Sequence, residues 1–107
     1  MERWLFVAQR LTALLLAPLV VAHLALILYA VEGGLTAGEI LARTRGSVFW
    51  GGFYGLFVLA AAVHGPIGLR AILREWTPLP PALVNLAAFG AGLLLLALGW
   101  RAVAAVL

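Results

Sequence analysis

Two histidines, His23 and His64, lie inside apolar stretches of the chain. An ionisable imidazole within a hydrocarbon-facing segment is costly, so such a residue marks a functional site by default. Helical spacing places three small residues on the same face as the second histidine: Ala61, Gly65 and Gly68. That face is predicted to form a shallow trough around one metal-capable nitrogen. A flat, metal-centred ligand such as haem would suit it.

The composition indicates a membrane protein before any motif is considered. The 107 residues are 65% hydrophobic and only 10% charged, which leaves too little polar surface for a soluble domain of this size. The chain has no cysteine and therefore cannot ligate an iron–sulfur cluster. The net charge is +3 and the arginines are scattered, so a lipid bilayer rather than nucleic acid is the expected partner.

Three apolar runs are long enough to cross a bilayer, which takes about 20 residues. We expect an all-α integral membrane protein that forms a single membrane domain over 1–107, with spans near 5–31, 48–72 and 82–104. A tryptophan stands at an end of each predicted span, where an indole buries its ring and keeps its N–H in water. These residues are Trp4, Trp50, Trp76 and Trp100.

The connections between the spans are short. Thr36 and Glu39 have the spacing of a capping box, which predicts a short interfacial helix between the first and second spans. Pro81 suits the first turn of the third span. Asn85, close behind it, is a candidate for a hydrogen bond between helices.

Two pairs of small residues four positions apart predict close helix packing. Gly51 and Gly55 stand near the start of the second span. Ala88 and Gly92 stand in the third span. Packing of this kind needs no cofactor.

The two histidines are expected at different depths. His64 lies six residues before Arg70, about 9 Å from that end of its helix. His23 lies thirteen residues after Arg10, about 20 Å in from the same side. Imidazoles offset by about 10 Å along the membrane normal do not share one iron without strong helix tilt. If both bind haem, they bind two haems, and a partner chain supplies the second axial ligand of each.

Arg10 and Arg70 fall at the same predicted membrane edge as His64. An arginine at low dielectric is a suitable partner for a haem propionate or a quinone carbonyl, although positive-inside anchoring explains the same residues without a ligand. Thr12 is a candidate quinone contact, unless its hydroxyl bonds back along the helix, in which case it has no functional role. The membrane side with the N-terminus carries four arginines and the other side carries three, which favours a cytoplasmic N-terminus.

Two stretches resemble the small membrane anchor subunits of the succinate dehydrogenase/fumarate reductase family, also called complex II. They are residues 9–13 (Gln-Arg-Leu-Thr-Ala) and residues 64–70 (His-Gly-Pro-Ile-Gly-Leu-Arg). The resemblance extends over nearly the whole chain in length, span count and loop plan. In that family a histidine followed four residues later by glycine, late in the second helix, is an axial ligand of haem b. The resemblance thus implies this role for His64.

The resemblance also bears on Glu75, Trp76 and His23. In the smaller anchor subunit an Asp-Tyr pair follows the haem histidine by eleven and twelve residues, and the tyrosine contacts quinone. Glu75 and Trp76 occupy those positions here, which implies an altered site and leaves menaquinone as well as ubiquinone open. Two-haem members carry a ligand histidine in their first helix, and His23 is similar to it. An interhelical hydrogen bond is the alternative role for His23.

As a whole, the resemblance implies an electron-transfer anchor subunit in a bacterial inner membrane. Such a subunit serves an enzyme of the tricarboxylic acid cycle and does not catalyse a reaction alone. Its partners would be a second anchor subunit that shares one haem b or two, and flavoprotein and iron–sulfur subunits on the cytoplasmic side. Two alternatives stay open. One is a cofactor-free structural or assembly protein that packs through GxxxG-type contacts, and the other is a transporter subunit with His64 in a proton path.

Overall fold

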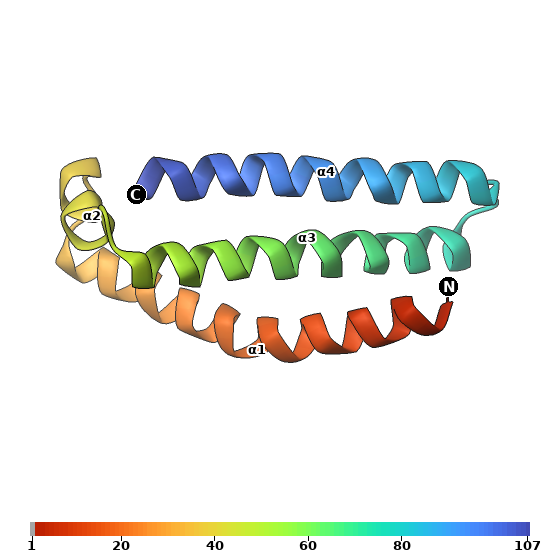
Figure 1. The fold of residues 1–107 in the computed structure, drawn as a ribbon, viewed down its shortest axis with the longest axis horizontal. Helices are drawn as coiled ribbons and strands as arrows, with labels where there is room; N and C mark the ends of the chain where they lie inside the picture. Colours follow the sequence, from red (N-terminus) through yellow and green to blue (C-terminus); the bar gives the residue numbers. More distant parts are fainter. Residues whose placement is uncertain (1) are drawn as a thin grey trace.

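The computed structural model describes residues 2–107, which form four helices. They are α1 (Glu2–Gly33), α2 (Ala37–Thr44), α3 (Val48–Trp76) and α4 (Pro81–Val106). The three long helices lie side by side, with α3 between α1 and α4 (Figure 1). The all-α class is therefore confirmed, and so is the short helix between the first and second spans.

Each long helix extends beyond its predicted span. Helices α1, α3 and α4 contain 32, 29 and 26 residues. At 1.5 Å per residue they are about 48, 44 and 39 Å long. All three are long and apolar enough to cross a membrane. Since the hydrocarbon core is about 30 Å thick, their ends reach into the headgroup regions.

The short helix α2 begins at a side-chain cap. The Thr36 hydroxyl accepts the Glu39 backbone N–H at 3.2 Å and donates to the Glu39 carboxylate at 2.7 Å. The predicted cap is thus confirmed, although the carboxylate binds the hydroxyl instead of the backbone N–H that a capping box uses. Gly34 precedes the cap with a φ of +120°, and a side chain there would collide with the Glu39 carboxylate.

The end of α4 is tied to the residues that follow α2. The Thr44 hydroxyl donates to the Val106 carbonyl, and the Gly46 N–H donates to the Leu107 carbonyl at 3.2 Å. Carbonyls at a helix C-terminus have no donor within their own helix. These two bonds supply donors from another part of the chain and hold the C-terminus beside α2 (Figure 1).

Small residues let α3 and α4 approach closely. A Cβ on Gly92 would lie 3.1 Å from the side chain of Pro66 and 3.4 Å from the carbonyl oxygen of Ala62. Ala88, one turn earlier on α4, is buried. The predicted packing role of Ala88 and Gly92 is confirmed, and Pro81 stands in the first turn of α4 as expected.

The predicted Gly51–Gly55 pair is confirmed only in part. A Cβ on Gly51 would lie 3.2 Å from the side chain of Leu107, so this glycine does face α4. Apart from its two chain neighbours and the adjacent backbone of α3, no atom of residues 2–107 lies within 4 Å of the corresponding position on Gly55. Within the chain, therefore, only one glycine of the pair serves close packing.

Few apolar side chains are buried between the helices. In the part of the chain that the structure describes, four hydrophobic residues are buried: Ala60, Val84, Ala88 and Val103. Large apolar side chains along all three long helices are exposed instead. In a membrane this outward surface meets lipid or other apolar helices, so packing between the helices depends on close backbone approach and on polar contacts.

We expect Gly92→Leu to weaken the contact between α3 and α4, because the new side chain would meet Pro66 and the Ala62 carbonyl. Overpacking of this kind costs about 1–3 kcal/mol. Gly90→Leu is the matched control, since no atom of α1, α2 or α3 lies within 4 Å of its Cβ position. Thermal unfolding of the full chain in detergent, followed by circular dichroism, measures both variants. Equal losses would contradict the packing role of Gly92.

Candidate functional site

His64 and Thr12 form a polar contact across the interface between α3 and α1. The Thr12 hydroxyl oxygen lies 3.3 Å from Nδ1 of His64. Thr12 is buried, and His64 is half-buried. The contact thus gives Nδ1 of His64 a polar partner within an apolar region, where an unpaired polar group is costly.

The Thr12 hydroxyl also bonds back along its own helix. It donates to the Ala8 carbonyl at 2.8 Å and lies 3.1 Å from the Gln9 carbonyl. A back-bonded threonine was expected to have no functional role. That alternative is too narrow, because a hydroxyl with one hydrogen and two lone pairs serves its own helix and a second helix together. The Thr12 hydroxyl faces His64, so the group that was predicted to contact quinone is already engaged by the histidine.

The small residues around His64 do not form one open trough. A Cβ on Gly68 would lie 3.4 Å from the amide nitrogen of Gln9 on α1. A Cβ on Gly65 would lie 3.0 Å from the side chain of Leu95 on α4. The two glycines therefore face different helices and allow each to approach α3. The prediction of a single open bed for a flat ligand is wrong, because packing within the chain already covers these positions.

Gln9 is a polar residue of the same interface that was not predicted as a site residue. Its side chain lies against Gly68, and its Oε1 is buried with no hydrogen-bond partner among residues 2–107. Thr12 follows three residues later and so lies on the same helix face. The signal in the sequence was this helical spacing, which puts Gln9 and Thr12 on one face of the first span.

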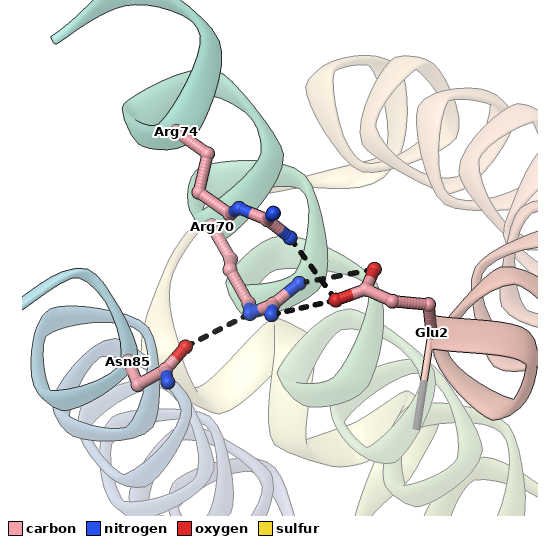
Figure 2. A network of polar contacts seen from close by, with 4 residues as sticks. All are labelled: Glu2, Arg70, Arg74 and Asn85. Carbon is pink, nitrogen blue, oxygen red and sulfur yellow. Dashed lines mark hydrogen bonds and ion pairs between the residues drawn. The ribbon is translucent and has the colours of Figure 1, made fainter. Parts of the chain in front are cut away.

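A polar network joins all three long helices near the N-terminus (Figure 2). Arg70 of α3 donates from Nη2 to Oε1 of Glu2 on α1 at 2.8 Å. Its Nε donates to Oδ1 of Asn85 on α4 at 2.9 Å. Arg74 donates from Nη1 to the same Glu2 oxygen at 3.0 Å. The interhelical bond predicted for Asn85 is confirmed, whereas the central role of Glu2 was not predicted.

The structure brings only some of the predicted edge residues together. Glu75 and Arg70 line one surface hollow, with Arg74 and Glu2. Trp76 is 80% exposed at the end of α3. Arg10 is also exposed, and its guanidinium lies over the Phe6 ring of its own helix, 5.4 Å from the centroid. Arg70 and Glu75 therefore form one group, and Arg10 stands apart from it.

His23 lies at another level of the bundle. Its ring packs edge-on against Tyr54 and Phe57 of α3, with centroids 6.3 and 5.2 Å away. A cavity of about 340 Å³ beside it reaches Val103 of α4. Eleven residues separate Thr12, at the level of His64, from His23, which corresponds to about 16 Å of helix. The two imidazoles are thus apart in depth.

The residues at His64 fit one kind of metal group. No cluster of three or more His, Cys, Asp or Glu side chains lies together in residues 2–107, so a bare metal ion finds no multi-ligand site there. Haem iron takes a single imidazole on each axial side. At His64 one ring nitrogen faces Thr12, and the other makes no hydrogen bond to the residues that the structure describes. This donor set suits axial ligation.

A family model described as the succinate dehydrogenase/fumarate reductase transmembrane subunit matches residues 1–99. The chain belongs to this family. No curated protein and no solved structure gives a match. Together with three helices able to cross a membrane, the family makes the chain a multi-pass membrane anchor subunit. The resemblance seen in the sequence is thereby confirmed.

In this anchor subunit we expect Arg70→Met to lower the thermal unfolding midpoint, because it removes the contacts of α3 with Glu2 and Asn85. Arg101→Met is the matched control, since Arg101 is exposed and makes no hydrogen bond within residues 2–107. Both are measured on the full chain in detergent. If the two variants unfold at the same temperature, the network does not hold the three helices together.

Proposed function

We propose that this anchor subunit ligates haem b through His64, together with a second membrane anchor subunit, and forms part of a quinone site. The observation that carries the proposal is the environment of His64. It is a half-buried imidazole inside an apolar span, held through one nitrogen against Thr12. Such a residue is costly in a membrane and is typically used for function. Membership of the succinate dehydrogenase/fumarate reductase family supports the same role.

Haem b supplies one-electron transfer when it is bound. His64 would provide one axial nitrogen, and the second anchor subunit would provide the other. The chain has only two histidines and no cysteine, and His23 lies at another depth. His23 is therefore proposed as a ligand only for a second haem, shared in the same way.

The proposed quinone site is the surface hollow lined by Glu2, Arg70, Arg74 and Glu75. Guanidinium groups donate hydrogen bonds to quinone carbonyls, and carboxylates exchange protons with the reduced quinone. Arg70 already binds a carboxylate, that of Glu2, and a haem propionate is a group of the same kind. The proposed role of Arg70 toward a propionate or a quinone rests on its ion pair with Glu2.

Three further candidates from the sequence stand outside this hollow. Arg10 and Trp76 are exposed and remain candidates for the rim of the quinone site, which takes menaquinone or ubiquinone. Thr12 faces His64, so its hydroxyl is better explained by the histidine than by quinone.

The proposed partners besides the second anchor subunit are the flavoprotein and iron–sulfur subunits. They would dock at the end of the bundle that holds the N-terminus and the α3–α4 connection (Figure 1). Four of the seven arginines lie toward this end, and this small excess favours a cytoplasmic location of it in a bacterial inner membrane. The arginines concerned are Arg3, Arg10, Arg70 and Arg74. The chain would then pass electrons between the iron–sulfur subunit and quinone in the membrane.

In the assembled complex we expect His64→Ala to remove the haem bound at His64, because its iron loses an axial ligand. The b-type signal of the reduced-minus-oxidised spectrum then disappears if the complex holds one haem and falls by half if it holds two. Immunoblotting of each subunit establishes that the complex still assembles. His23→Ala is the matched control and should keep the haem bound at His64. The number of haems per complex in that variant falls by half if His23 binds a second one.

An unchanged spectrum in an assembled His64→Ala complex would contradict haem ligation by this chain. It would favour the cofactor-free structural role, for which the open position at Gly55 offers a packing surface.

We expect Arg74→Gln to raise the KM for quinone about tenfold, the effect of losing one hydrogen bond from a charged donor. Arg101→Gln, at the opposite end of the bundle, is the control. Succinate-dependent reduction of quinone is compared with reduction of a soluble dye, which reports on the flavoprotein and iron–sulfur subunits alone. Equal KM values in the two variants would place the quinone site elsewhere.

A further inference from the structure

We infer that Thr12 is a positioning residue that fixes the tautomer of His64 and leaves Nε2 as the nitrogen able to bind iron. The inference rests on the proposed function of His64 as a haem ligand. It concerns a contact between two helices, α1 and α3, and assigns a role to a hydroxyl that the quinone site does not use.

The argument begins with the single hydrogen of the Thr12 hydroxyl. The Ala8 carbonyl at 2.8 Å and the Gln9 carbonyl at 3.1 Å are acceptors only, so the hydroxyl hydrogen is directed at them. Oγ1 therefore presents a lone pair to Nδ1 of His64 at 3.3 Å. A favourable contact then requires the imidazole hydrogen on Nδ1.

The position of that hydrogen decides the chemistry of the ring. A neutral imidazole with its hydrogen on Nδ1 carries its free lone pair on Nε2. Nε2 of His64 makes no hydrogen bond to residues 2–107 and is thus left without a competing protein donor. Metal-bound histidines almost always donate their other N–H to an oxygen, which orients the ring and raises the basicity of the ligating nitrogen.

The back bond of Thr12 adds to this effect. It holds the hydroxyl in one orientation, and a hydroxyl that donates to a carbonyl becomes a better acceptor. The back bond alone would satisfy the hydroxyl on any face of α1. The back bond therefore does not explain why the buried Thr12 side chain lies against His64. The contact with Nδ1 of His64 accounts for this placement, and that contact is what would fix the tautomer.

The tautomer is tested first in the full chain, labelled with ¹⁵N-histidine and reconstituted without haem in phosphatidylcholine vesicles at pH 8. The chain has two histidines, so the variant His23→Ala assigns the signals in solid-state NMR spectra. We expect His64 to show a protonated Nδ1 and an unprotonated Nε2. A protonated Nε2 in the wild-type chain overturns the inference without any variant of Thr12.

A pair of variants then isolates the hydroxyl. Thr12→Val keeps the shape of the side chain and removes the hydroxyl, whereas Thr12→Ser keeps the hydroxyl. In vesicles we expect both tautomers of His64 in the valine variant and the Nδ1–H form in the serine variant. In the assembled complex the valine variant should bind haem about tenfold more weakly, as for loss of an outer-shell partner. Its haem midpoint potential should shift upward, because a less basic imidazole stabilises ferric iron less, and serine should restore both values.

The inference and the proposed function fail separately. If an assembled His64→Ala complex keeps the full haem content of the wild type, the proposed function fails, whatever the tautomer. If His64→Ala loses the haem while Thr12→Val matches the wild type in tautomer, haem affinity and potential, the proposed function stands and the role of Thr12 is overturned. If the valine variant does not assemble, the tautomer measured in the wild-type chain decides.

Discussion

Hydrocarbon offers no hydrogen bonds, so a polar side chain within the three spans is costly unless the protein itself supplies a partner. This constraint explains how the long helices are joined. Thr12 and His64 meet between α1 and α3. Arg70 reaches Glu2 on α1 and Asn85 on α4 from the middle helix. Helix α3 thus carries the polar groups that hold both of its neighbours, and the candidate haem ligand lies on the same helix.

The remaining packing is sparse, which suits an anchor subunit. Glycine contacts such as Gly92 with Pro66 bring α3 and α4 together without a large buried core. Most large apolar side chains point away from the bundle. Lipid or the helices of a second anchor subunit would cover them in a complex of this family. The proposed haem shared between two subunits is consistent with such an arrangement, because each subunit would then supply one of the two axial ligands.

Sequence patterns are informative where a single residue carries the signal. His64 was recognisable as a side chain in need of a polar contact, because an imidazole in an apolar run is rare and costly. Asn85 was recognisable for the same reason. Glu2 and Gln9 were not, because a charged residue at a helix end and a glutamine near one are ordinary in a membrane protein. Their roles depend on which residues of α3 lie opposite them, and no spacing within α1 contains that information.

The sequence by itself determined that three apolar helices cross a membrane, where they begin and end to within a few residues, and that His64 and His23 lie at different depths. These properties follow from local hydropathy, capping and helix rise, which act along one helix at a time. Only the tertiary structure decided that Gly65 and Gly68 face different helices, that Glu2 joins Arg70, and that Thr12 meets Nδ1 of His64. The physical reason is that the rotation and height of one helix against another are set by contacts between them, and those contacts exist only once the helices have packed.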